Sequence, residues 1–191
     1  MLRLALAGLA VSAALMVLAW LVSVLRRDVG IVDTFWGLAV AGSGVGYAAT
    51  GGDGGDRGRL AVVLALAWML RLSWHILRRN WSQPEDRRYR EIRARNEPGF
   101  WWKSAYLIFA FQALLAWLVG LPLLGAVAAR APLNALDAVG VLLWLFGMLF
   151  EAAADRQLAL FQGDPANHGR VMDRGLWRYS RHPNYFGEFC I

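Results

Sequence analysis

The chain has 191 residues, of which 58% are hydrophobic, and its formal net charge is +6. A soluble domain is about 45–50% apolar, so this composition excludes a water-soluble globular protein as a serious alternative. The single cysteine, Cys190, excludes an intramolecular disulfide. No Cys/His cluster has zinc spacing, so we expect no metal site.

The apolar residues are collected into runs long enough to cross a bilayer, which takes about 20 residues per helix. Backbone in hydrocarbon must satisfy its own hydrogen bonds, and the runs do not alternate, so helices are favoured over a barrel. We predict an all-α, polytopic transmembrane helix bundle that forms a single domain over 1–191. Five full spans and the start of a sixth are expected at about 4–25, 29–49, 60–77, 105–127, 135–152 and 183–191.

The connections between these runs are polar. The first run is too long for the apolar core of a signal peptide, and more spans follow it. The stretch 50–58 is rich in Gly and Asp and predicts a turn, and longer polar loops are expected at 78–103 and 156–182. Pro183 fits the first turn of a new helix. The chain stops barely two turns later, so we expect a shortened chain or gene fragment.

The basic residues are distributed unevenly between the two sides of the predicted bundle. The loops after odd-numbered spans hold fifteen, whereas the remaining loops and the N-terminus hold four. The positive-inside rule therefore places the N-terminus outside and the loops 78–103 and 156–182 in the cytoplasm. This topology accounts for the positive charge, so we expect no nucleic-acid partner. Nineteen of the twenty basic residues are arginine, which is typical of a GC-rich bacterial gene, so we predict a multi-pass protein of the bacterial inner membrane.

Polar side chains recur at helical spacing near the predicted cytoplasmic end of four spans. They are Asp33, then Arg71 and His75, then Glu151 and Asp155, and finally Asn184 and Glu188. Residues four apart share one helix face, and charged groups inside spans are usually functional or paired. The sequence therefore predicts a polar cavity with a basic rim at the cytoplasmic end, which suits an anionic cofactor.

Structural roles are the alternatives for these residues. Arg71 pairs with Asp33 or Glu151 in one such reading, His75 is a packed histidine, and Asp155 is an ordinary interface residue. Topology alone would also explain the basic loops. Three glycines of the second span, Gly42, Gly44 and Gly46, do not match the dinucleotide pattern, and we interpret them as sites of close helix packing.

One stretch is more specific than the rest, GLWRYSRHPNYFGE at 175–188. Its RHPNYFGE part resembles the C-terminal signature of the steroid 5-alpha-reductase superfamily, and more narrowly its bacterial branch of DUF1295 membrane proteins. VDTFWG at 32–37, RRNW at 78–81 and EDRRY at 85–89 also agree with that branch. Sterol reductases and isoprenylcysteine carboxyl methyltransferases carry related versions of the signature.

The resemblance implies a multi-helix reductase that takes hydride from NADPH and reduces the C=C bond of an apolar enone, either steroid-like or a lipid. By the family's pattern, cofactor contacts fall on Asn184 and Glu188, and on Glu151 and Asp155 at the end of the preceding span. The steroid reductases carry Asn rather than Glu at the position of Glu151. Further neighbours of the cofactor are expected at Arg174, Arg178, Arg181, His182 and Tyr185.

The steroid enzymes also use an early acidic residue and a tyrosine to polarise the substrate carbonyl. No tyrosine lies between Tyr47 and Tyr89, so the resemblance assigns catalytic roles to Asp33 as the acid and His75 as the donor. The family chain normally continues past the signature, and we therefore expect an incomplete site in a chain that ends at Ile191.

Two other function classes stay open. An S-adenosylmethionine-dependent methyltransferase of a lipid-like acceptor would share the signature and the cytoplasmic site. A non-enzymatic membrane protein on the same scaffold would not need Asn184 or Glu188. The expected partners are the lipid bilayer and an apolar small molecule, and the sequence leaves the substrate and the oligomeric state open.

Overall fold

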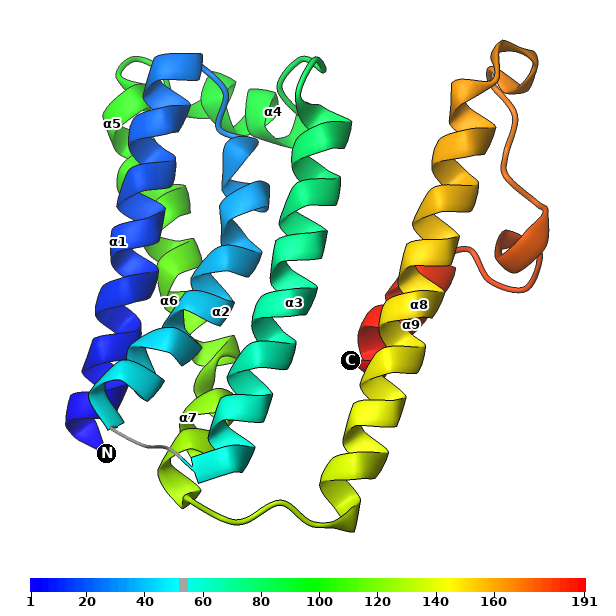
Figure 1. Ribbon diagram of the computed structural model, residues 1–191. Helices are drawn as coiled ribbons and strands as arrows, with labels where there is room; N and C mark the ends of the chain where they lie inside the picture. Colours follow the sequence, from blue (N-terminus) through cyan, green and yellow to red (C-terminus); the bar gives the residue numbers. More distant parts are fainter. Residues whose placement is uncertain (52–54) are drawn as a thin grey trace. The chain divides into compact units, whose positions relative to one another are not determined.

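The structure is a computed structural model that describes residues 1–51 and 55–191 (Figure 1). The centre of the turn predicted at 50–58 lies outside these described residues. All regular structure in the described part of the chain is helical, as predicted. The chain falls into two compact units, Met1–Pro132 and Leu133–Ile191, and each is described by itself. The single domain expected over 1–191 stays a prediction.

Over its described residues, the first unit is built from three long helices, a fourth long helical stretch over Phe100–Ala129 and the short helix α4. Its elements are α1 (Leu2–Arg26), α2 (Ile31–Gly51), α3 (Gly55–Asn80), α4 (Arg87–Asn96), α5 (Phe100–Ser104), η1 (Ala105–Ala110), α6 (Phe111–Val119) and α7 (Leu121–Ala129). The element η1 is a π-helix turn, and α4 lies across one end of the unit, beside the ends of α1 and α3 (Figure 1).

Among the described residues, four helices are long and apolar enough to cross a membrane: Leu2–Arg26, Gly55–Asn80, Phe100–Ala129 and Ala135–Gly163. They coincide with four of the five predicted full spans. The remaining predicted span, 29–49, is helix α2, which is not one of the four. The predicted direction of the chain across the membrane stays a prediction.

Helix α2 packs against α1, α3, α6 and α7. Its glycines permit these contacts, as the sequence predicted. A Cβ at Gly46 would lie 2.9 Å from the Ala7 carbonyl oxygen of α1, and a Cβ at Gly44 would lie 2.8 Å from Leu123 of α7. Ser43 adds a hydrogen bond from its hydroxyl to the Gly8 carbonyl of α1, with a length of 3.1 Å. Helix α2 is therefore enclosed by the other helices of its unit.

Helix α1 turns a stripe of mostly small residues toward the inside of its unit. The stripe consists of Gly8, Ser12, Met16, Ala19 and Ser23, all buried. Spacings of three and four residues place them on one helix face, and small side chains let neighbouring helices approach closely. The Ser12 hydroxyl also donates a hydrogen bond of 2.8 Å to the Ala113 carbonyl of α6.

The second unit is a long helix with a returning segment. It contains α8 (Ala135–Gly163), the 3-10 turns η2 (Pro165–Asn167) and η3 (Gly175–Arg178), and α9 (Pro183–Cys190). Helix α8 begins with a capping box between Asn134 and Asp137. It continues well past the predicted end of the span at 152, so the first eight residues of the loop predicted at 156–182 are helical.

Helix α9 crosses α8 where both carry glycine. A Cβ on Gly187 would lie 2.7 Å from the Glu151 backbone nitrogen and 2.8 Å from the Gly147 carbonyl oxygen. Beside this crossing, Phe186 packs against Phe150, with ring centroids 5.4 Å apart. The glycine of the RHPNYFGE signature is therefore explained by backbone contact between the two helices.

Candidate functional site

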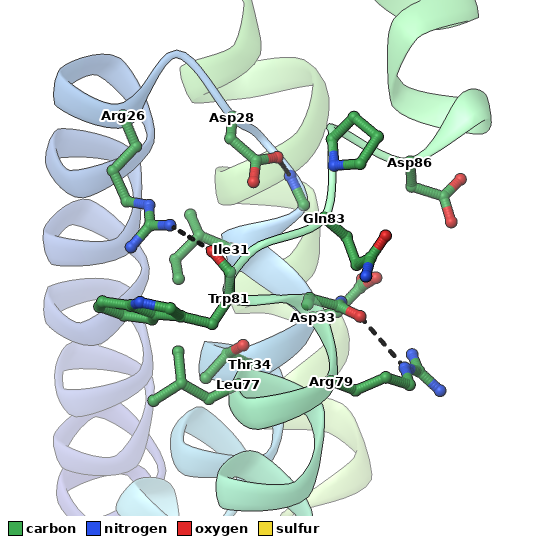
Figure 2. A pocket seen from close by; sticks show the side chains of 13 residues that line it. Arg26, Asp28, Ile31, Asp33, Thr34, Leu77, Arg79, Trp81, Gln83 and Asp86 are labelled. Carbon is green, nitrogen blue, oxygen red and sulfur yellow. Dashed lines mark hydrogen bonds between the residues drawn. The ribbon is translucent and has the colours of Figure 1, made fainter. Parts of the chain in front are cut away.

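A polar cavity of about 160 Å³ lies at the end of the first unit (Figure 2). The end of α1, the start of α2, the end of α3 and the following loop surround it. Its lining residues are Arg26, Asp28, Gly30, Ile31, Asp33, Thr34, Leu77, Arg79, Asn80, Trp81, Gln83, Pro84 and Asp86. Asp33, which the sequence assigns as the acid, is thus one of three carboxylates in the lining.

Two side chains of helix α4 contact the Asp33 carboxylate. The Tyr89 hydroxyl donates a hydrogen bond of 2.6 Å to Asp33 Oδ1, and an Arg88 guanidinium nitrogen lies 3.6 Å from Asp33 Oδ2. Tyr89 is only 8% exposed. Burial, and after it the hydrogen bond to Asp33, raises the pKa of Tyr89 above its usual range. The phenol therefore stays a donor and fixes the orientation of the carboxylate.

The loop before α4 is ordered by two acidic residues. Asp86 caps the helix by accepting the Arg88 backbone N–H at 2.8 Å, and a cap of this kind contributes about 1 kcal/mol. The Arg88 side chain also donates to Asp86, and this bond, followed by the backbone one, lowers the pKa of the Asp86 carboxyl. Glu85, at 10% side-chain exposure, pairs with Arg93 at 2.7 Å. It also accepts the Val29 N–H at 2.9 Å and so ties α4 to the turn between α1 and α2.

His75, the predicted donor, occupies a different position from Asp33. It lies on α3 together with Arg71, and both side chains are partly buried. Neither is among the residues that line the cavity in the described part of the chain. The assignment of His75 as a catalytic donor stays a prediction.

The signature in the second unit folds back on the end of α8. The Trp177 indole donates a hydrogen bond of 2.9 Å to the Ala154 carbonyl, and Gln157 accepts the Leu176 N–H at 2.9 Å. Gly175 has a φ of +58°, and a Cβ there would collide with Gln157, so glycine suits this position on both counts. These contacts attach the segment before the RHP sequence to helix α8.

The signature asparagine meets a carboxylate of α8. Asn184 Nδ2 donates to Asp155 Oδ1 over 3.3 Å. Asp155 is 7% exposed, and Glu151, one turn earlier, is 3% exposed. The Asn184 Oδ1 atom is buried and accepts no hydrogen bond within the described residues. Glu188 lies on the following turn of α9, partly buried. The four residues predicted to touch the cofactor are thus carried by two helices in contact.

The other predicted cofactor neighbours lie at the surface. Arg174, Arg178 and Arg181 are exposed, and so are His182 and Tyr185. The rings of His182 and Tyr185 are stacked, with centroids 5.0 Å apart and an interplanar angle of 15°. Exposed guanidinium groups are available for phosphate oxygens, which they bind in bidentate fashion.

The described residues contain no group of three His, Cys, Asp or Glu side chains that could hold a metal ion. Each polar cluster lies within its own unit: Asp33 with Tyr89 and Arg88, and Asp155 with Asn184. The prediction that the clusters share one pocket stays a prediction.

Sequence reasoning missed Tyr89 and Gln157. Tyr89 stands between Arg88 and Arg90 on a basic segment, so the pattern indicates a solvated helix rather than a buried phenol. A signal was present, since Tyr89 and Ile92 are the only large uncharged side chains of α4 and lie three residues apart. Gln157 had no such signal, because its role depends on the returning segment.

The family model described as "Protein of unknown function (DUF1295)" matches residues 19–191. No curated protein and no solved structure matches the chain.

Proposed function

This chain belongs to the DUF1295 family, and from that membership we propose that it is a membrane-embedded, NADPH-dependent reductase of a C=C bond in an apolar enone, steroid-like or lipid. The proposal rests on the resemblance of the RHPNYFGE segment to steroid 5-alpha-reductases and on one structural observation. That observation is the buried pair Asp155–Asn184, with an acceptor atom left over.

The residues of the second unit fit a nicotinamide group. The buried Asn184 Oδ1 has no hydrogen-bond partner among the described residues, and a buried acceptor without a partner costs about 1–3 kcal/mol. The carboxamide N–H of nicotinamide is a donor that would remove this cost. The hydrogen bond to Asp155 fixes the orientation of the Asn184 side-chain amide, so that its oxygen stays available as the acceptor. Asn184 and Asp155 would therefore bind the nicotinamide end.

The exposed arginines before α9 suit the other end of the cofactor. Arg174, Arg178 and Arg181 lie within eight residues of the signature, and each is exposed. NADPH carries phosphate groups that such side chains bind. We assign the phosphates to these arginines, and the stacked pair His182–Tyr185 to the flat face of a ring of the cofactor.

When bound, NADPH supplies the hydride, and the protein supplies orientation and electrostatics. Reduction of an enone also needs charge stabilisation at the carbonyl oxygen, which a positioned donor provides. We keep His75 as that donor and Asp33 as the acid. Tyr89 acts as a positioning residue, because it fixes the Asp33 carboxylate.

The test is cofactor binding by the purified full-length protein in lipid nanodiscs, measured by calorimetry with NADPH and separately with S-adenosylmethionine. We expect NADPH to bind, and we expect Asn184→Ala to weaken it by roughly tenfold, which corresponds to one lost hydrogen bond with a buried group. Asn167→Ala is the matched control, because Asn167 bonds to the Phe161 carbonyl, away from the pair.

Three results would contradict the proposal. Binding of S-adenosylmethionine without NADPH would favour the methyltransferase. No binding of either compound would favour a non-enzymatic role. Equal NADPH affinity in Asn184→Ala and Asn167→Ala would mean that Asn184 does not contact the cofactor.

A further inference from the structure

A second, apolar hollow lies on the first unit, between α1 and the segment formed by η1 and α6. Its volume is about 310 Å³. The residues that line it are Leu9, Ala13, Met16, Val17, Trp20, Ala105, Phe109, Ala110, Ala113 and Leu114. Because Val17 is 54% exposed and Leu114 is 45% exposed, the hollow is an open groove on the outer surface of its unit.

The chemistry of the groove selects for plain hydrocarbon. All ten lining residues are apolar. The Trp20 indole N–H is already donated to the Trp101 carbonyl at 2.9 Å, and the nearby Ser12 hydroxyl to the Ala113 carbonyl at 2.8 Å. A ligand with polar substituents would lose its own hydrogen bonds to water on entering and find these donors occupied.

The π-helix turn η1 forms one wall of the groove. It contributes Phe109 together with the small Ala105 and Ala110. A π-helix turn interrupts the regular α-helical stacking of side chains, and such turns are frequent at functional sites. Phe109 is 2% exposed, whereas Ala110 is exposed, so this wall runs from the buried side of the turn to its outer side.

The length of the groove matches one leaflet of a bilayer. From Leu9 to Trp20 a helix rises about 17 Å, and half of a hydrocarbon core of about 30 Å is close to that length. At the Trp20 end, Trp101 and Trp102 are 60% and 48% exposed, as is usual for tryptophans at the level of the headgroups. The groove therefore begins at the interface and runs toward the middle of the membrane.

We propose that this groove is a binding site for one acyl chain of a phospholipid, taken from the leaflet on the Trp20 side. The bilayer around the spanning helices supplies this ligand at high concentration. The site does not depend on the reductase proposal, because it uses neither the polar cavity nor the signature residues.

The experiment uses photo-crosslinking in nanodiscs of phosphatidylglycerol, a fraction of which carries a diazirine on one acyl chain. The wild type is compared with Ala13→Leu and Ala14→Leu. Ala13 lines the groove, whereas its neighbour Ala14 is exposed and does not, so the two variants add the same bulk to the same helix. Thermal unfolding by circular dichroism verifies that both variants fold.

We expect crosslinks within 9–20 and 105–114 in the wild type and in Ala14→Leu, and roughly tenfold fewer there in Ala13→Leu, because leucine fills the space of several methylene groups. A uniform spread of crosslinks over all lipid-facing helices would overturn the proposal. Equal crosslinking in the two variants would overturn it as well. A third contrary result is a dimer in native mass spectrometry that dissociates in Ala13→Leu. A second copy of the chain would then cover the groove. If Ala13→Leu does not fold, Ala110→Leu takes its place, with the same two results decisive.

Discussion

Tyr89 shows how much a single side chain can depend on a distant partner. It is separated from Asp33 by 56 residues in sequence, and it donates a hydrogen bond to that carboxylate from a basic helix. A hydrogen bond to a charged group contributes about 1.5–3 kcal/mol. The bond therefore fixes the position of α4 against α2. It also fixes the orientation of Asp33, the predicted acid that lines the polar cavity.

The raised pKa of Tyr89 gives a prediction about pH. A phenol whose pKa is higher in the folded state than in the unfolded state stays neutral longer, so its stabilising effect is present below about pH 10 and is lost as the pH rises further. We expect the absorbance of phenolate at 295 nm, taken as wild type minus Tyr89→Phe, to stay at zero past about pH 10, where a free phenol loses its proton.

The signal of Tyr89 should then appear together with unfolding, followed by circular dichroism in the same titration. A phenolate signal in the difference spectrum near pH 10, in protein that is still folded, would contradict a buried phenol bonded to Asp33. Tyr179→Phe is the control, since Tyr179 is 85% exposed and its replacement should leave the pH at which the protein unfolds unchanged.

At the scale of elements, the crossing of α8 and α9 depends on two glycines. Replacing Gly187 by alanine places a Cβ 2.7 Å from a backbone nitrogen of α8. A backbone atom cannot turn aside as a flexible side chain can, so we expect Gly187→Ala to destabilise the folded protein by about 1–3 kcal/mol. The measurement is thermal unfolding in detergent, followed by circular dichroism.

Gly140 supplies the control for that measurement. It lies on α8, and nothing stands within 4 Å of the place where its Cβ would be. Gly140→Ala should be neutral or stabilising by up to about 1 kcal/mol, because alanine favours the helix. Equal midpoints for the two variants would mean that the helices do not cross at Gly187.

The same two helices show what the sequence can and cannot predict. Continuous apolar runs predicted four of the spans, because composition over 20 residues decides whether a helix tolerates hydrocarbon. The apolar run predicted at 135–152 is shorter than helix α8, which continues to Gly163, because Asp155 and Arg156 interrupt the apolar side chains but not the helix. In the structure Asp155 is buried and bonded to Asn184, and that partner lies 29 residues further along the chain.

The residues of the candidate site, too, were only partly predictable from the sequence. The RHPNYFGE segment pointed to Asn184 and Glu188 by resemblance, and their spacing placed them on one face of a helix. The sequence did not predict that Trp177 and Gly175 serve to seat this segment on Ala154 and Gln157. Contacts between segments distant in sequence leave no periodic pattern in the chain, so residues of this kind become visible only in the folded unit.

For the whole molecule, the distribution of basic residues predicts which loops face the cytoplasm, and labelling tests this. In a Cys190→Ala background, cysteines placed singly at Ser82 and Leu133 report on the two sides of the membrane. Both positions are exposed. We expect a membrane-impermeant maleimide to label Leu133→Cys in intact spheroplasts, and Ser82→Cys only after permeabilisation.

The opposite pattern would place the N-terminus inside and move the signature to the outer face, where NADPH is absent. Labelling of both positions in intact spheroplasts would mean that the cells leak. A third cysteine, at Arg87 on the exposed side of α4, should behave as Ser82→Cys does.

The enclosed position of α2 has a consequence for how the protein enters the membrane. A segment that leaves the insertion machinery alone must be soluble in lipid by itself, and α2, with Asp33 and its run of glycines, is less suited to this than its neighbours. Its small residues fit against α1 on one side and α7 on the other. We therefore expect biogenesis to proceed by helical hairpins, with α1 waiting beside the translocon until α2 emerges and the two move into the bilayer as a pair.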